Sequence, residues 1–398
     1  MSDDSTSKKT LAQQTLALAD GLADGRVDRR SFVRGALALG LGLPSIAAVL
    51  QACSGSEAPP ETPKAPTGAA VVKPAGPPDL GELEKELKIY NWSDYIAEDT
   101  VANFEKESGV KVTYDTFESN EELIAKLQAG ASGYDLVCPS GYAVQVLLAL
   151  KLLEELRPKY IPNLGNVAPQ FRKMAFDPTD AYAVPWQWGM TGIAYRADKV
   201  KAPPDSWAVF HDAQYKGKMT MMDDMRDVIG AWLKFRGKSL NSSVPEDLAA
   251  AKADALTAKA LLQSYVSAPV KGQLVAGDVW IAQLWNGDTL QAKAENDKID
   301  WILPKEGGVI WADSMVIPKG APNPRAAHAF LDYILRADVG AAISDFTGYG
   351  SPNAAATAKM AKPVPYPTEE QMKLLEFQSD LAGASGAWDQ IWTEIKAG

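Results

Sequence analysis

The chain has little of what most catalytic and metal sites require. Its 398 residues include only two histidines, His211 and His328, and two cysteines, Cys53 and Cys138, with no metal-ligand spacing among them. No GxSxG, GxGxxG or Walker A segment occurs, so common hydrolase and nucleotide-binding signatures are missing. His328 is expected on a helix surface, whereas Cys138 ends an apolar run and is expected to be buried. The sequence therefore predicts no catalytic residue, no metal and no cofactor.

A long, continuous hydrophobic segment is also missing. The uncharged stretch 35–52 contains three glycines and a proline, which makes it weak as a permanent membrane span. It follows Arg29-Arg30 with Phe32 shortly after, a pattern typical of twin-arginine export signals. Cys53 comes directly after a small Ala, as at a lipoprotein cleavage site. We therefore expect a twin-arginine lipoprotein signal peptide over 1–52 and lipidation of Cys53. A cleaved signal with an incidental cysteine, or a buried helix, remains the alternative.

The next segment has no apolar periodicity. Residues 54–80 contain seven prolines among Ala, Gly, Ser and Thr. Such composition is typical of an extended linker, with a reach of ~3.1 Å per residue where it is polyproline-like. Residues 53–81 are thus predicted to be a lipidated Cys followed by a Pro/Ala-rich tether.

The chain also has fewer basic than acidic residues. The whole chain has a net charge of −10, and the first 52 residues hold six basic and five acidic residues, so the remainder carries −11. A net negative charge disfavours nucleic acid as a partner and weakly favours a cationic ligand.

From residue 82 onward, short β-like runs alternate with amphipathic segments. The expected strands are 87–91, 110–116, 134–138, 219–222, 279–284, 301–303 and 309–317, and the expected helices are 98–108, 121–129, 144–150, 228–235, 247–265, 326–336 and 339–344. Alternation of this kind predicts an α/β fold. Ligands in such sheets bind beyond the carboxyl ends of the strands.

A tryptophan followed closely by an aspartate occurs at three predicted sheet ends. The pairs are Trp92/Asp94, Trp285/Asp288 and Trp311/Asp313. An aromatic face attracts an organic cation and covers its methylenes, while a carboxylate accepts its N–H bonds. Each pair alone is also explained by a core Trp and a helix-capping Asp. Three pairs together favour a site for a small amine.

The densest acidic cluster directly follows a predicted strand. Asp224 and Asp227, three residues apart, would share one face of a helix and hold one ammonium between them. Stabilisation of the helix N-terminus by Asp223 is the structural alternative.

From about Leu87 to its C-terminus, the chain resembles the bacterial periplasmic spermidine/putrescine-binding proteins of polyamine ABC importers. The motifs that carry the resemblance are Tyr90–Tyr95, Glu118–Glu121, Tyr134–Val137, Pro139-Ser140, Trp285–Gly287, Pro304–Gly308, Asp313-Ser314 and Gly348-Tyr349. The resemblance implies a two-lobed periplasmic binding protein fold (type II-like) with ligand in the cleft. One lobe would contain 82–192 and 311–357, and the other 193–310 and 358–398.

The resemblance also implies a set of ligand-binding residues. Trp92, Tyr95, Trp285, Trp311 and Tyr349 would line the methylene chain; Asp94, Asp224, Asp227 and Asp313 would hold ammonium groups; Ser93, Ser140, Tyr142 and Gln378 would add polar contacts. Asp288, like Ser93-Asp94, is similar to the putrescine-preferring branch, whereas Trp311 and Asp313 are more similar to the spermidine branch. Asp94, Asp227 and Asp288 are thus the residues on which ligand length is expected to depend.

The implied function is capture of polyamines outside the cytoplasm and their delivery to an ABC transporter permease. A monomer, lipid-anchored in the periplasm, is expected. A polyamine sensor that docks on a membrane signalling receptor is the alternative job for the same site. An exported amine-processing enzyme is disfavoured by the missing catalytic groups, and a ferric-ion receptor by the lack of clustered Tyr and His.

Overall fold

The computed structural model describes residues 81–130, 133–267, 269–364 and 366–398. The predicted signal peptide, Cys53 and the tether as far as residue 80 lie outside these residues. Within the described ranges, no helix is long and apolar enough to cross a membrane.

Ten strands form one hydrogen-bonded sheet in the described part of the chain. Its path is β2-β1-β3-β9-β4-β7-β5-β6, with β10 paired to β9 and β8 paired to β4. The strands are β1 (Glu86–Trp92), β2 (Lys111–Phe117), β3 (Leu136–Val137), β4 (Ala183–Arg196), β5 (Met219–Met221), β6 (Ser264–Tyr265), β7 (Ile281–Trp285), β8 (Ile299–Ile302), β9 (Gly308–Val316) and β10 (Leu375–Phe377).

Helices cover both faces of this sheet. They are α4 (Thr100–Ser108), α5 (Asn120–Gln128), α6 (Gly141–Ala149), α7 (Met225–Phe235), α8 (Pro245–Lys259), α9 (Val270–Ala276), α10 (Asn286–Glu295), α11 (Pro324–Ile334), α12 (Ala337–Thr347), α13 (Ala354–Thr357), α14 (Glu369–Leu374) and α15 (Ser385–Ala397). Short 3-10 helices occupy Pro158–Tyr160, Pro162–Asn166, Pro169–Phe171, Trp207–His211, Ala213–Tyr215 and Ala382–Ala384.

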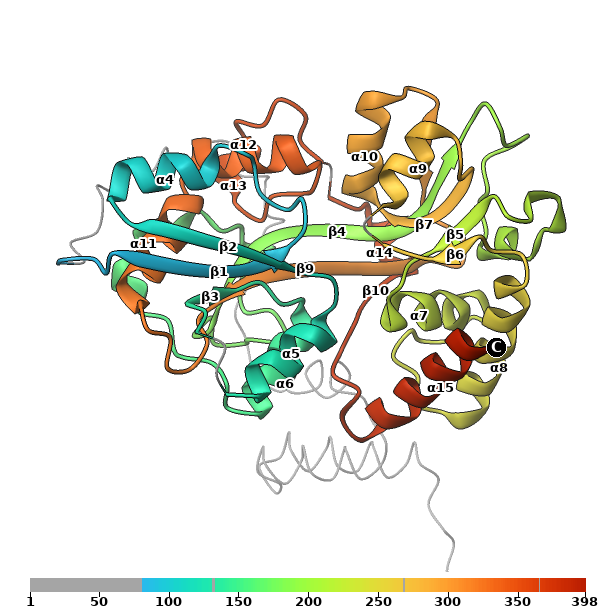
Figure 1. Ribbon diagram of the computed structural model, residues 1–398, viewed down its shortest axis with the longest axis horizontal. Coiled ribbons are helices and arrows are strands. Elements are labelled where there is room, and N and C mark those ends of the chain that lie inside the picture. Colours follow the sequence, from blue (N-terminus) through green and yellow to red (C-terminus); the bar gives the residue numbers. More distant parts are fainter. Residues whose placement is uncertain (1–80, 131–132, 268, 365) are drawn as a thin grey trace, which may run out of the picture. The chain divides into compact units, whose positions relative to one another are not determined.

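The sheet has two parallel parts joined by antiparallel strands. β1 pairs in parallel with β2 and β3, and β5 pairs in parallel with β6 and β7. Between them, β4 is antiparallel to β9 along its first part and to β7 and β8 along its second part. We call β1–β3 with α4–α6 and α11–α13 the first lobe, and β5–β7 with α7–α10 and α15 the second lobe. β4 and β9 run through both (Figure 1).

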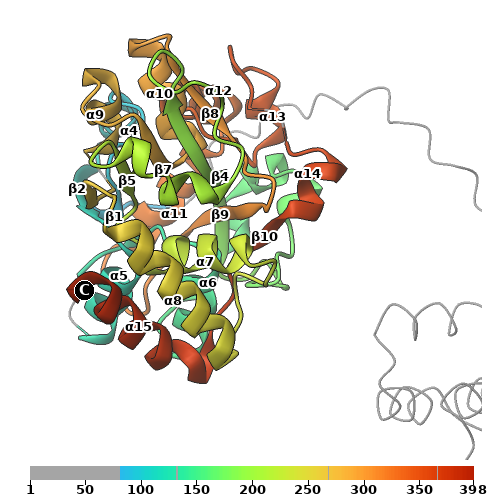
Figure 2. The same cartoon turned by 90° about the vertical axis from the view of Figure 1, so that its right-hand side faces the viewer.

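The alternation of side chains along each strand builds a core on either face of each lobe. In β1, Leu87 and Ile89 pack in one buried cluster with Phe330 of α11, whereas Tyr90 points into another cluster with Leu123 of α5. In β7, Ile281 packs with residues of α7, α8 and α15, and the next residue packs with α9. Figure 2 shows these helices on opposite sides of the second lobe. The predicted two-lobed α/β fold is confirmed, whereas the exact lobe boundaries stay a prediction.

Two local expectations are wrong. The helix predicted over 247–265 ends at Lys259, because the chain beyond it pairs with β5: the Gln263 N–H donates to the Met219 carbonyl at 2.7 Å. His328 is buried rather than on a helix surface, since the 3-10 segment near Tyr160 covers it. Its Nε2 accepts from the Arg157 N–H at 2.9 Å. Cys138 is buried, as predicted.

Candidate ligand-binding site

A cavity with about 540 Å³ of empty space, part of it open to solvent, lies between side chains of both lobes. Its walls combine five aromatic rings, four carboxylates and four neutral polar groups, without any Lys or Arg. The lining residues are Trp92, Ser93, Tyr95, Asn120, Ser140, Asp224, Asp227, Trp285, Asp288, Trp311, Asp313, Tyr349 and Gln378.

Twelve of the fourteen residues expected to bind a ligand line this cavity. They are Trp92, Ser93, Tyr95, Ser140, Asp224, Asp227, Trp285, Asp288, Trp311, Asp313, Tyr349 and Gln378. The structure does not place the other two, Asp94 and Tyr142, on its wall. Asn120 lines the cavity and was not predicted, although it lies within the motif Glu118–Glu121.

The aromatic residues come from separate parts of the chain and meet edge to face. The centroids of the Trp311 and Tyr349 rings are 5.1 Å apart, and those of Tyr95 and Tyr349 are 5.3 Å apart. Trp92 and Trp285, from the ends of β1 and β7, form a second pair at 6.4 Å. Interlocked rings of this kind keep their faces in fixed positions, which suits recognition of an alkyl chain.

Glycines let two of these rings lie against the backbone. A Cβ on Gly287 would come within 2.3 Å of the Tyr349 ring, and one on Gly189 within 2.5 Å of Trp311. Both distances are far inside van der Waals contact, so any side chain there would displace the ring. The Gly in the Trp285–Gly287 motif is thus a sequence signal for close packing at the cavity wall.

Asp313 is a buried carboxylate of the cavity lining. It is 5% exposed, its Oδ2 accepts from the Tyr95 hydroxyl at 3.0 Å, and its Oδ1 has no hydrogen-bond partner among the described residues. Burial raises the pKa of Asp313 to about 7, against the opposing effect of the Ser140 and Tyr95 hydroxyls. The expectation that Trp311 and Asp313 lie at a strand end is wrong, because both lie within β9 and pair with β4. Asp313 therefore enters the cavity from the middle of the sheet.

The second group of carboxylates lies at the start of α7. Asp224 is the N-cap residue, and its Oδ1 accepts from the Asp227 N–H at 2.9 Å. Asp227 is buried, and its Oδ1 has no partner among the described residues. Burial and the neighbouring Asp224 carboxylate raise the pKa of Asp227. Asp224 thus caps the helix and lines the cavity at the same time, whereas the sequence suggests Asp223 for the stabilisation of this helix end.

Arg226, between these two aspartates in sequence, does not enter the cavity lining. Its guanidinium lies 4.8 Å from the Tyr142 ring centroid and 5.0 Å from that of Trp388. It donates to the Ser379 carbonyl and the Asn241 side chain. Tyr142 is buried in this stack, and its hydroxyl donates to Glu121 Oε1 at 3.0 Å. Tyr142 therefore contacts Glu121 and Arg226 outside the cavity lining.

Asp288, like Asp313, accepts a hydrogen bond from a tyrosine hydroxyl. Its Oδ1 accepts from the Tyr349 hydroxyl at 2.6 Å, which links α10 of the second lobe to the segment after α12 of the first. Burial raises the pKa of Asp288, while the Tyr349 hydroxyl and the Lys271 ammonium oppose that rise.

Asp94 lies outside the cavity, in the loop after β1. Its side chain is 73% exposed, and its Oδ2 forms an ion pair with Lys271 Nζ at 3.2 Å. Its φ of 52° places it in the left-handed region that Asp tolerates better than most residues.

Asn120 and Ser140 fix each other at the edge of the cavity. The Ser140 N–H donates to Asn120 Oδ1 at 3.0 Å, and Asn120 Nδ2 donates to Ser140 Oγ at 3.1 Å.

Within the described residues, no group of three or more His, Cys, Asp or Glu side chains has the arrangement of a metal site. The cavity is therefore built to accept hydrogen bonds and positive charge from a ligand that is largely apolar between its charges.

Comparisons with known proteins agree with this fold and cavity, which define a two-lobed binding protein. A family model described as bacterial extracellular solute-binding protein matches residues 99–373. The spermidine/putrescine-binding periplasmic protein of Escherichia coli strain K12 is 33% identical over 319 residues, covering 78% of this chain and 92% of that protein. The putrescine-binding periplasmic protein PotF of the same strain is 35% identical over 345 residues, covering 80% and 93%.

A solved structure shows the same relationship. The Tp0655 (TpPotD) lipoprotein of Treponema pallidum has a TM-score of 0.71 and 32% identity, over 78% of this chain and 99% of that chain. The chain belongs to the family of bacterial extracellular solute-binding proteins, whose members bind substrates for transport and are not enzymes.

Proposed function

We propose that this protein captures polyamines, putrescine or spermidine or both, and delivers them to an ABC importer. The observation that carries the proposal is that two carboxylate residues of the aromatic cavity, Asp227 and Asp313, each keep a buried oxygen, Oδ1, without a donor among the described residues. Buried acceptors left unpaired are costly, and a ligand ammonium would satisfy them.

A linear amine fits both kinds of wall. Its methylenes would lie against the rings of Trp92, Trp285 and Trp311, and its ends would meet the carboxylates of the two lobes. Each cation–π contact contributes ~0.5–2 kcal/mol when it is desolvated. A burial cost remains for every ammonium without a carboxylate, so the spacing of carboxylates selects the length of the ligand.

The names of the relatives support the ligand and the delivery step. One is named for spermidine and putrescine and another for putrescine, and a third relative of known structure is named as an ABC transporter substrate-binding protein. We propose a permease as the protein partner, the periplasm as the location, and a monomer as the working form. β4 and β9 would act as the crossover segments about which the lobes of 82–192 plus 311–357 and 193–310 plus 358–398 close.

Attachment to a membrane is part of the proposal. The twin-arginine pattern and the Ala-Cys53 site support export and lipidation, and the Treponema pallidum relative is itself named a lipoprotein. Metabolic labelling with a lipid precursor, compared between the wild type and Cys53→Ser, tests this step.

Calorimetry on the purified protein tests the ligand. We expect heat of binding and a rise in melting temperature with putrescine, cadaverine or spermidine, because a ligand that binds only the folded state stabilises it. γ-Aminobutyrate, in which a carboxylate replaces one ammonium, should bind at least about tenfold more weakly, since it would face Asp227 or Asp313 with like charge. Equal binding of γ-aminobutyrate, or no response to any polyamine, would overturn the proposal.

A further inference from the structure

Lys271 lies outside the cavity lining, and its ammonium group acts electrostatically on Asp288, a carboxylate of that lining. Its Nζ lies 3.2 Å from Asp94 Oδ2 and donates to Gln291 Oε1 at 2.8 Å. The Lys271 side chain is only 21% exposed. Asp94 follows β1 of the first lobe, whereas Lys271 is in α9 of the second lobe, so this ion pair spans the two lobes. No sequence pattern connects the two residues.

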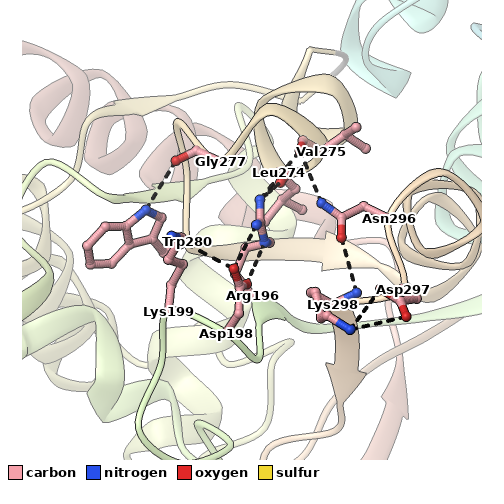
Figure 3. Close-up of polar contacts among 10 residues, drawn as sticks. All are labelled: Arg196, Asp198, Lys199, Leu274, Val275, Gly277, Trp280, Asn296, Asp297 and Lys298. Atoms are coloured by element: carbon pink, nitrogen blue, oxygen red, sulfur yellow. Dashed lines mark hydrogen bonds and ion pairs between the residues drawn. The ribbon is translucent and has the colours of Figure 1, made fainter.

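The position of Lys271 is fixed by contacts at the opposite end of its helix. Figure 3 shows Arg196, at the end of β4, donating to the Leu274 carbonyl at 3.0 Å while it is held in a double hydrogen bond by Asp198. Asn296 donates to the neighbouring Val275 carbonyl at 3.2 Å. The free carbonyls at the C-terminal end of α9 are therefore satisfied, which restrains the helix that carries Lys271.

The carboxylates around the cavity fall into two groups according to their partners. Asp313 and Asp227 each keep a buried oxygen without a donor. Asp94 forms an ion pair with the Lys271 ammonium. Asp288 accepts a hydrogen bond from the Tyr349 hydroxyl, and the charge of Lys271 acts to lower its pKa. Asp227 lies in α7 of the second lobe, and Asp313 lies in β9, which runs through both lobes.

We infer that Lys271 is a specificity-determining residue: paired with Asp94 just outside the cavity lining, it supplies near Asp288 the positive charge that a third ligand ammonium would otherwise bring. The site then accepts a linear diamine, with one ammonium at Asp313 and the other at Asp224 and Asp227. It disfavours a triamine, whose third ammonium would meet the charge of Lys271 and find Asp94 occupied. This inference rests on the proposed polyamine-binding function and adds its preferred ligand class.

Replacement of Lys271 by Met tests the inference, because Met keeps much of the apolar side chain and removes the charge. We expect the wild type to bind putrescine at least about tenfold more tightly than spermidine. The affinity of Lys271→Met for spermidine should be at least about tenfold higher than that of the wild type, and its affinity for putrescine should change by less than about threefold. Isothermal titration calorimetry with both amines measures these ratios.

Two control variants separate this effect from a general change in charge. Lys293→Met removes one positive charge from α10, where Lys293 pairs with Asp300 at 3.0 Å outside the cavity lining; it should leave both affinities unchanged. In the double variant Asp94→Asn/Lys271→Met, the gain for spermidine should disappear, because the freed carboxylate is missing. Unfolding curves for each variant verify that the fold is retained.

The outcomes distinguish this inference from the proposed function. A wild type that binds neither amine overturns both. A wild type that binds putrescine, combined with an unchanged putrescine-to-spermidine ratio in Lys271→Met, overturns the role of Lys271 alone. The role of Lys271 is also overturned if the wild type prefers spermidine, or if Lys293→Met shifts the putrescine-to-spermidine affinity ratio as much as Lys271→Met does.

Discussion

Asp313 and Asp94 each follow a tryptophan by two residues, yet the fold puts them in opposite states. Asp313 lies within β9, is 5% exposed and keeps one oxygen without a donor among the described residues. Asp94 lies in a loop after β1, with a side chain that is 73% exposed and paired with Lys271. The same short motif thus yields one carboxylate ready for a ligand cation and one already engaged. Position relative to the sheet decides which is which.

The largest effect expected from this contrast is on ligand affinity. Asp313→Asn should weaken putrescine binding by at least about a hundredfold, because it removes the negative charge that would pair with a buried ammonium, an interaction of ~3–5 kcal/mol. Asp94→Asn should weaken it by less than about tenfold, since that carboxylate is exposed and binds Lys271. Calorimetry on both variants measures the difference. Equal losses in the two would remove the distinction between them.

Stability of the ligand-free protein should change in the opposite direction. The pKa of Asp313 is raised from 3.8 to about 7, so the folded state holds its proton more tightly than the unfolded chain. Ionisation of Asp313 therefore lowers the free energy of unfolding. This loss is absent at pH values below the pKa of the unfolded chain, grows as the pH rises between the two pKa values, and is complete above the pKa of the folded protein. Asp313→Asn, which has no charge to bury, should raise the free energy of unfolding by roughly 1–4 kcal/mol at about pH 8.

Urea unfolding at two pH values checks this prediction. The advantage of Asp313→Asn over the wild type should be present at about pH 8 and largely gone at about pH 4. Asp94→Asn, measured in parallel, should show no gain at high pH, because it removes an exposed ion pair rather than a buried charge. A destabilised Asp313→Asn at high pH would mean that the carboxylate is already compensated in the ligand-free fold.

The sequence was sufficient where a residue's role depends on its immediate neighbours. β1 and β2 lie within one residue of their predicted bounds, since more and less buried side chains alternate over Glu86–Ile89 and Lys111–Asp115. Trp92 and Trp285 were also found from local pattern, because each ends a strand and an aspartate follows closely, whereas Tyr95 and Tyr349 were expected only from the family resemblance. Local pattern failed at β6, where pairing with β5 overrides the helical preference of the preceding segment.

Contacts between distant segments could not be predicted in this way. Lys271 and Asp94 are 177 residues apart, and nothing in the local sequence around Lys271 indicates that it pairs with Asp94. Asn120 was missed because its partner Ser140 is brought near only when α5 and α6 pack together. The partners that decide whether a carboxylate is free to bind a ligand are thus contributed by helices and strands distant in sequence. This explains why the residues of the cavity lining were easier to predict than the partners of its carboxylates.

The last expected effect is a dependence of affinity on pH. The ligand ammonium should bind the ionised form of Asp313, and the pKa of that group is raised to about 7 in the folded protein. Lowering the pH through about 7 protonates the carboxylate, so the dissociation constant for putrescine should rise by up to about tenfold per pH unit below it. Burial also raises the pKa of Asp227, which would steepen the fall. Titrations in wild type and Asp94→Asn should share this profile, because the exposed carboxylate of Asp94 is not the one being desolvated. A pH-independent affinity between about pH 8 and pH 5 would show that Asp313 remains ionised in the cavity, and the contrast between the two Trp–Asp pairs would then rest on exposure alone.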